Sequence, residues 1–215
     1  MVLFYVAGFP AQAAGAGEAK ILVVGDSLSA GYGLAADENW VSLLDQRLTA
    51  QGYEYQVVNA SVTGDTTRGG RARIAKALAR HKPVLLIIEL GGNDGLRGIR
   101  IEEMRENLAA MIEAGQASGA KVLLISMKIP PNYGAAYAGE FAKTYALLAS
   151  KYGLPAPPFL LTDVALDNGL IQADGIHPNA RAQPLMLDNV WPALSGLLQR
   201  TPCAGKPAKS LSEAG

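Results

Sequence analysis

Short, continuous runs of apolar residues alternate along this chain with stretches in which apolar residues recur every three or four positions. The continuous runs contain mainly valine, isoleucine and leucine, a pattern typical of strands buried on both faces of a sheet. We expect strands at residues 21–24, 53–58, 84–90, 121–127 and, as a shorter fifth, 159–161.

The intervening stretches predict amphipathic helices. Val41, Leu44 and Leu48 fall at i, i+3 and i+7, and Gly52 follows them as a helix stop. The same spacing predicts helices around residues 68–81, 104–112, 141–148 and 185–194. Because such strands alternate with such helices, we predict one α/β domain with a parallel sheet covered on both faces. The sequence contains no visible domain linker or internal repeat.

The rest of the chain is organised around the residues that end the first strand. Gly25 marks the exit from the strand, and Ser27 lies at the turn that follows it. A serine in this place can attack a carbonyl with its hydroxyl and bind the resulting oxyanion with its backbone N–H. Helix N-capping is the simpler interpretation of a serine at such a junction. This stretch alone does not separate the two interpretations.

Polar residues follow several of the predicted strands. Ser27, Gly64 and Asn93 follow the first, second and third strands, and Asp174 and His177 follow the last one. The carboxyl ends of parallel strands lie at the same edge of a sheet, where open α/β sheets bind ligands. We therefore expect these residues to converge in space.

Asp174 and His177 are spaced i, i+3, which one helical turn brings together. The carboxylate can then hold one imidazole nitrogen and leave the other free to take a proton from Ser27. Serine needs such a base because its hydroxyl is too weak an acid to attack unaided. The other histidine of the chain, His81, lies at a predicted helix C-terminus, where the helix dipole favours a surface cation. His177 is therefore the candidate base.

Gly64 and Asn93 are candidates for binding an oxyanion. A glycine suits a loop whose backbone N–H approaches a ligand closely, and the Asn93 amide can donate two hydrogens without carrying charge. A tight turn is the alternative interpretation of residues 91–94. We interpret Asp26 and Asp94 as turn or capping residues, and Glu89 as a hydrogen-bonded structural carboxyl group.

Composition and charge exclude several function classes. The 215 residues include 19 Lys and Arg and 19 Asp and Glu, without the basic cluster that nucleic acid or an anionic membrane surface requires. The single cysteine, Cys203, and two distant histidines favour neither a disulfide framework nor a metal site. Glycine-rich nucleotide-binding motifs are absent from the sequence. We expect no cofactor, no metal and no nucleic-acid partner, and the sequence does not predict an oligomeric state.

The two ends of the chain differ in composition from the middle. Residues 1–10 are almost wholly apolar, and Ala11-Gln12-Ala13 resembles a signal-peptidase site, although a basic start is missing. The apolar run is too short to span a bilayer, so we expect no integral membrane segment in the mature chain. We assign residues 1–19 to an imperfect export signal or a disordered N-terminus, 20–200 to the catalytic domain and 201–215 to a disordered tail. A cytoplasmic protein with an inaccurate start or a cloning remnant is the alternative.

Four sequence blocks resemble those of the GDSL (SGNH) hydrolases, in the same order along the chain. The likeness covers about residues 20 to 200. Residues 25–31, 90–98 and 131–134 further resemble the bacterial subgroup of thioesterase I/protease I/lysophospholipase L1 and arylesterases. The blocks are Gly25-Asp26-Ser27-Leu28, Gly64, Asn93 within residues 91–94, and His177 within residues 174–178.

The resemblance implies a flavodoxin-like three-layer α/β/α fold with a five-stranded parallel sheet. It also implies that Ser27 is the nucleophile and that His177 is a base oriented by Asp174. The backbone N–H groups of Ser27 and Gly64 and the side chain of Asn93 are then the oxyanion hole. In this subgroup Leu96, Ile99 and Ile129 match positions that line an acyl groove, and members are typically exported to the periplasm. We therefore expect a periplasmic or secreted protein.

We predict a serine hydrolase that cleaves acyl esters and thioesters through an acyl-enzyme without a metal. Its expected partner is a small-molecule substrate, with aryl esters, acyl thioesters and lysophospholipids as candidates. Deacetylation of carbohydrate or cell-wall esters is an alternative, against which the apolar groove residues argue. A non-catalytic module that holds a small ligand at the same sheet edge is a further alternative from another class.

Overall fold

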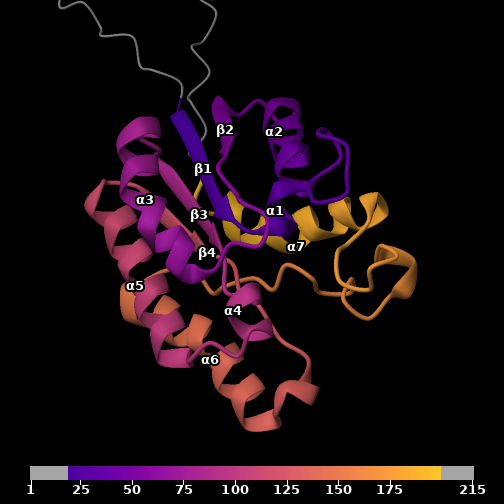
Figure 1. Ribbon diagram of the computed structural model, residues 1–215. Helices are drawn as coiled ribbons and strands as arrows, with labels where there is room; N and C mark the ends of the chain where they lie inside the picture. The colour runs from indigo at the N-terminus through magenta and orange to yellow at the C-terminus, as the bar shows by residue number, and fades with distance from the viewer. Residues whose placement is uncertain (1–18, 200–215) are drawn as a thin grey trace, which may run out of the picture.

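The computed structural model describes residues 19–199, which form three layers (Figure 1). A parallel sheet forms the middle layer, with strand order β2-β1-β3-β4. The strands are β1 (Ala19–Gly25), β2 (Tyr55–Asn59), β3 (Leu85–Glu89) and β4 (Lys121–Leu124). The predicted α/β fold class with a parallel sheet is confirmed.

Helices cover both faces of the sheet (Figure 1). Leu22 and Val24 of β1 pack on one side of the sheet, whereas Ile21 and Val23 pack on the other. Because each central strand buries both faces, residues 21–24 of β1 and 85–88 of β3 are all apolar and do not alternate with polar residues. One face is covered by α3 (Thr67–His81), α5 (Ile101–Ala117) and α6 (Ala135–Tyr152), and the other by α2 (Trp40–Ala50) and α7 (Gln183–Ser195).

Short helical segments occupy the turns around the sheet. The helices α1 (Ser27–Ala30) and α4 (Gly92–Leu96) directly follow β1 and β3. Residues 91–94, for which a tight turn was the alternative interpretation, thus begin a short helix. The 3₁₀ turns are η1 (Pro131–Tyr133), η2 (Asn168–Leu170) and η3 (Ala180–Ala182).

The predicted fifth strand is a single β-bridge in this structure. Phe159 pairs in parallel with Ser126, just beyond the end of β4, and the Ser126 N–H donates to the Pro158 oxygen at 2.8 Å. Pro157 and Pro158 have no N–H to donate, so the pairing cannot extend toward the N-terminus of this segment. The prediction of five strands is therefore corrected to four, with residue 159 marking the place of the fifth.

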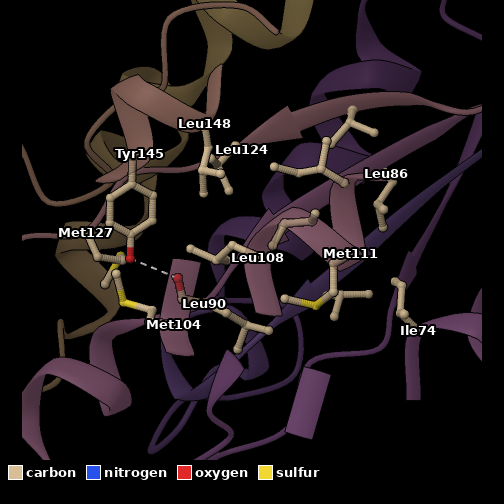
Figure 2. Close-up of a cluster of buried hydrophobic side chains, with 14 of the residues drawn as sticks. Ile74, Leu86, Leu90, Met104, Leu108, Met111, Leu124, Met127, Tyr145 and Leu148 are labelled. Carbon is tan, nitrogen blue, oxygen red and sulfur yellow. Dashed lines mark hydrogen bonds between the residues drawn. The ribbon is translucent and has the colours of Figure 1, made fainter. Parts of the chain in front are cut away.

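The buried core fixes the direction in which the chain leaves β3. Figure 2 shows Tyr145 of α6 donating its hydroxyl hydrogen to the carbonyl oxygen of Leu90, at 3.0 Å. The next residue, Gly91, has a φ of 119°, and a Cβ atom there would collide with the Tyr145 hydroxyl. Only glycine fits this close approach. The position of α4, which carries Asn93, is thus set by core packing.

The predicted export signal and the predicted disordered tail lie almost entirely outside the described residues. Ala19 already begins β1. Cys203 also lies outside the described part. Between residues 19 and 199, no helix combines the length and apolar character needed to cross a bilayer.

Candidate active site

Ser27 lies at the first position of α1, immediately after the end of β1. The residue is 9% exposed. The N-cap of this helix is Asp26, whose Oδ1 accepts from the Leu28 N–H at 3.0 Å. Asp26 therefore accepts from a backbone N–H at the start of the helix, as predicted for a capping residue. The Ser27 hydroxyl is not needed as a cap and can bond to another partner.

The hydroxyl of Ser27 meets the imidazole of His177, 150 residues away in sequence. Ser27 Oγ and His177 Nε2 are 2.9 Å apart, and His177 Nδ1 and Asp174 Oδ2 are 2.6 Å apart. An ionised carboxylate only accepts hydrogen bonds, so Nδ1 carries the hydrogen and Nε2 accepts from the Ser27 hydroxyl. The three side chains thus form a relay in which serine can pass its proton to histidine.

Asp174 and His177 are brought together by an aspartate-centred turn and not by the predicted helical turn. Asp174 Oδ1 accepts from the backbone N–H groups of Ile176 at 2.9 Å and of His177 at 3.0 Å. The i, i+3 spacing serves this turn equally well, because a short side chain can bond to the backbone two and three residues later. The backbone hydrogen bond from His177, followed by its side-chain hydrogen bond, lowers the pKa of Asp174 to about 2.

Gln172 ties the loop that carries His177 to the segment that follows Ser27. Its Nε2 donates to the Tyr32 oxygen at 2.8 Å and to the Pro178 oxygen at 2.9 Å. Its backbone N–H donates to the His177 oxygen at 2.7 Å. The Tyr32 ring lies against the imidazole, with ring centroids 4.4 Å apart. Sequence reasoning missed Gln172 and Tyr32, because neither residue type nor spacing distinguishes them from ordinary loop residues.

The two remaining residues of the predicted oxyanion hole come from the loops after β2 and β3. Asn93 lies in the first turn of α4, and its Nδ2 donates to Asp26 Oδ2 at 3.1 Å. Gly64 adopts a φ of 77°, and its carbonyl oxygen accepts from Arg97 Nη2 at 3.0 Å. Arg97 follows α4 directly and so joins the second loop to the third. The five residues predicted to converge come from the carboxyl side of the sheet, as expected.

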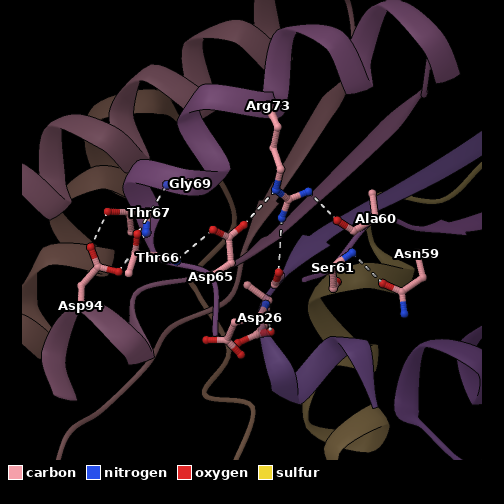
Figure 3. Close-up of polar contacts among 12 residues, drawn as sticks. Asp26, Asn59, Ala60, Ser61, Asp65, Thr66, Thr67, Gly69, Arg73 and Asp94 are labelled. Atoms are coloured by element: carbon pink, nitrogen blue, oxygen red, sulfur yellow. Dashed lines mark hydrogen bonds and ion pairs between the residues drawn. The ribbon is translucent and has the colours of Figure 1, made fainter. Parts of the chain in front are cut away.

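A half-buried arginine, Arg73, joins the end of β1 to the loop after β2, as Figure 3 shows. Arg73 of α3 donates to Asp65 Oδ2 at 2.8 Å, to the Gly25 oxygen at 3.4 Å and to the Ala60 oxygen. Gly25 lies two residues before Ser27, and Asp65 directly follows Gly64. Sequence analysis did not identify Arg73, because a single arginine in an amphipathic helix is typical of a solvated face.

The structural roles predicted for the nearby carboxyl groups are confirmed. Asp94 accepts from the Thr67 N–H at 2.9 Å and from its hydroxyl at 2.5 Å, and burial raises the pKa of Asp94. Glu89 Oε2 accepts from the Ser29 hydroxyl at 2.6 Å and from the Asp26 N–H at 3.3 Å. Burial, with the neighbouring charge of Asp26 second, raises the pKa of Glu89 well above its usual range. Burial also raises the pKa of Asp26, to about 6.

The three residues predicted to line an acyl groove differ in exposure. Leu96 at the end of α4 is 42% exposed, and Ile99 is half-buried. Ile129 is buried in the core, close to Gly95 and Phe141. Leu96 and Ile99 can therefore touch a bound molecule directly, whereas Ile129 underlies the loop that carries them.

Metal-ligating side chains do not cluster in the part of the chain that the structure describes. No group of three or more His, Cys, Asp or Glu side chains is arranged there to hold a metal ion. His81 ends α3 and is half-buried, away from the site, in agreement with its predicted place at a helix C-terminus.

Comparison with known proteins gives consistent matches over this domain. A model of the GDSL-like Lipase/Acylhydrolase family matches residues 23–184. Esterase TesA of Pseudomonas aeruginosa is 51% identical over 178 residues, which cover 83% of this chain and 89% of that protein. Thioesterase 1/protease 1/lysophospholipase L1 of Escherichia coli K12 is 40% identical over 168 residues, covering 78% of this chain and 79% of that protein.

Solved structures give the same result. The crystal structure of TesA aligns with a TM-score of 0.80 and 49% identity, covering 83% of this chain and 99% of that one. The psychrotrophic esterase EstA from Pseudoalteromonas, inhibited by monoethylphosphonate, aligns with a TM-score of 0.78 and 37% identity. That match covers 82% of this chain and 97% of EstA.

Proposed function

The chain belongs to the GDSL-like lipase/acylhydrolase family and is a serine esterase or thioesterase, and we propose that Ser27, His177 and Asp174 are its catalytic triad. The observation that carries this proposal is the 2.9 Å contact between Ser27 Oγ and His177 Nε2. That distance lies within the range needed for a base to take the serine proton.

In the first half of the reaction Ser27 Oγ attacks the acyl carbonyl carbon, and its proton moves to His177 Nε2. The imidazolium that forms is stabilised by Asp174, which stays ionised because its pKa is about 2. The carbonyl oxygen becomes an oxyanion, which in this proposal accepts hydrogen bonds from the N–H groups of Ser27 and Gly64 and from the Asn93 amide. When the intermediate collapses, the bond to the leaving oxygen or sulfur breaks and His177 returns its proton to that atom.

The second half repeats these steps with water. His177 takes a proton from a water molecule as the water oxygen attacks the acyl-enzyme, and the same oxyanion donors hold the new tetrahedral intermediate. Collapse of that intermediate breaks the bond to Ser27 Oγ, which regains its proton from His177. The products are a carboxylic acid and an alcohol, phenol or thiol, and the residues named supply every proton transfer.

We assign the acyl chain of the substrate to the surface beside α4. Leu96 is exposed and apolar and follows Asn93 by one helical turn, so it lies within reach of a chain whose carbonyl is bound at Asn93. Ile99 extends this surface, and Ile129 supports it from the core. Aryl esters, acyl thioesters and lysophospholipids are the candidate substrates. An apolar surface of this kind favours these acyl groups over the acetyl groups of carbohydrate esters.

The triad is tested by replacing the nucleophile. Ser27→Ala should lower kcat for p-nitrophenyl butyrate by at least about 10⁴-fold, because the remaining groups supply only electrostatic stabilisation. Ser150→Ala, an exposed serine on α6, is the matched control and should behave as wild type. A fluorophosphonate probe should label wild type and Ser150→Ala but not Ser27→Ala. Wild-type turnover in Ser27→Ala would overturn the assignment.

The acyl surface is tested separately, by comparing the hydrolysis of octanoyl esters with that of acetyl-xylan.

We also propose that the protein is exported to the periplasm or secreted. The proposal is supported by the apolar residues 1–10 and the Ala11-Gln12-Ala13 pattern in the sequence. N-terminal sequencing of the protein from periplasmic and cytoplasmic fractions tests it. Cleavage near residue 13 is expected, and an intact Met1 in all fractions would contradict the proposal.

A further inference from the structure

Asp26 is a buried carboxylate that joins the nucleophile turn to Asn93. The residue is 2% exposed, and each of its two carboxylate oxygens has a different partner. Oδ1 accepts from the Leu28 N–H at 3.0 Å, within the helix that begins with Ser27. Oδ2 accepts from Asn93 Nδ2 at 3.1 Å, across 67 residues of sequence. One carboxylate therefore touches both the nucleophile turn and the amide assigned to the oxyanion.

The orientation of the Asn93 side-chain amide decides whether it attracts or repels an oxyanion. Rotation of the Asn93 amide by half a turn exchanges its NH₂ group for its carbonyl oxygen. In one orientation the group donates to the oxyanion, and in the other it presents an oxygen that repels it. An ionised carboxylate only accepts hydrogen bonds, so it pairs with the NH₂ group and not with the amide oxygen. One N–H of Nδ2 is used by Asp26, and the second stays free.

We propose that Asp26 is a positioning residue, which fixes the Asn93 amide so that its second N–H faces the oxyanion. The proposal rests on the proposed function, in which Asn93 binds the oxyanion formed at Ser27. Asp26 does not touch the substrate in this scheme. It acts through Asn93, and it also keeps the oxyanion donor in register with the nucleophile, because both are bonded to the same carboxylate.

Helix capping by itself does not account for Asp26. An N-cap needs one acceptor oxygen, which a neutral serine, threonine or asparagine supplies as well as an aspartate. Burying a carboxylate away from water costs free energy, and burial is the largest of the influences on the pKa of Asp26. The second oxygen accepts from Asn93 Nδ2, and Gly92 at the start of α4 lies near it, because a Cβ atom built on Gly92 would lie 3.5 Å from Asp26 Oδ2. The feature that requires a carboxylate is thus the bond to the amide.

A double-mutant cycle tests whether Asp26 acts through Asn93. Asn93→Ala should lower kcat for p-nitrophenyl butyrate by about 10² to 10³-fold, the usual cost of one oxyanion donor. Asp26→Asn should lower kcat by about 10 to 10²-fold with little change in KM, because an amide can donate to the Asn93 oxygen and so permits the wrong orientation. In the Asn93→Ala background, Asp26→Asn should cost less than about twofold.

An equal loss on Asp26→Asn in both backgrounds would overturn the proposal, because Asp26 would then act directly on the adjacent Ser27. Asp26→Ser gives a second test in a variant that keeps a capping hydroxyl but has no group for Asn93, and it should show the same coupling. Thermal unfolding and fluorophosphonate labelling confirm that each variant is folded. If Ser27→Ala is inactive but Asn93→Ala loses less than threefold, the triad stands and this inference fails. If Ser27→Ala is active, the proposed function itself fails.

Discussion

The two halves of the proposed catalytic relay are held in place by different means. Ser27 lies against the end of the sheet, and its turn is tied to distant parts of the chain through Asp26 and Arg73. Asp174 and His177 lie in a loop on the surface, where most of the hydrogen bonds join residues close in sequence. Besides the hydrogen bond between Ser27 and His177, the Gln172 side chain joins the two halves by donating to the Tyr32 oxygen.

The difference shows in the aspartates of the two halves. Asp26, in the nucleophile half, is buried, and burial raises its pKa to about 6. Asp174, in the base half, is exposed, and hydrogen bonds from His177 and Ile176 lower its pKa to about 2. The buried aspartate thus fixes the geometry of the turn at Ser27, whereas the exposed aspartate supplies a negative charge beside His177. An exposed loop can hold an ionised aspartate at little cost, and a buried turn can hold the nucleophile rigidly.

The largest effect on turnover is expected from removing the negative charge of Asp174, in the exposed half of the relay. Asp174→Asn should lower kcat by about 10³ to 10⁴-fold, because the amide NH₂ faces Nδ1 and favours the tautomer in which Nε2 carries the hydrogen. The Asn oxygen still accepts from the backbone, so the melting temperature should change little. Asp163→Asn, at another exposed aspartate, is the matched control and should keep wild-type activity. A loss below tenfold in Asp174→Asn would show that Asp174 does not orient the base.

A smaller effect is expected from cutting the tie between the halves. Gln172→Leu removes two side-chain hydrogen bonds of 2.8 and 2.9 Å and should lower kcat/KM by about tenfold, since each bond contributes about 1 kcal/mol. The loss should appear mainly in kcat, because the His177 loop is displaced and not the acyl surface. Gln116→Leu, which removes a side-chain bond to the Tyr152 oxygen far from the site, is the control. Equal activity in both variants would contradict a role for Gln172 in positioning the base.

The smallest effect on activity is expected from replacing Glu89, whose carboxyl group accepts from the Asp26 N–H and the Ser29 hydroxyl. Glu89→Gln keeps an acceptor for Ser29 and reproduces the neutral acid, so kcat near neutral pH should change little. Stability should respond instead. Because the pKa of Glu89 is raised above its ordinary value of 4.5 in the folded protein, the folded state holds the proton more tightly than the unfolded chain. The free energy of unfolding of wild type should therefore fall, relative to Glu89→Gln, as pH rises from 4.5 through the raised pKa.

Urea unfolding of both proteins at several values from about pH 5 to about pH 9 measures this slope. Glu54→Gln, at an exposed glutamate, is the control and should follow wild type at every pH. Parallel curves for wild type and Glu89→Gln would contradict the raised pKa. Together with the first prediction, the outcome distinguishes a buried carboxyl that governs stability from an exposed one that governs turnover.

The sequence alone predicted the parts of this protein that depend on local pattern. Continuous apolar runs marked the strands, and helical periodicity marked the main helices to within a few residues. Because the carboxyl ends of parallel strands share an edge, the order of strands and loops alone predicts that Ser27, Gly64 and Asn93 lie at one edge of the sheet. The spacing of Asp174 and His177 predicted their contact, although the turn that makes it is not helical. The prediction of a fifth strand was wrong because the prolines before Phe159 lack the backbone N–H groups that pairing with a neighbouring strand needs.

Tertiary structure alone decided which residues hold the site together. Asp26 and Asn93 are 67 positions apart, Gly25 and Arg73 are 48 apart, and Tyr32 and Gln172 are 140 apart. No local pattern marks such pairs, because a hydrogen bond across the fold depends on where two loops meet and not on the residues beside each partner. A sequence fixes its own periodicity and turn chemistry within a few residues, whereas contacts over long separations exist only after the sheet has brought its loops to one edge.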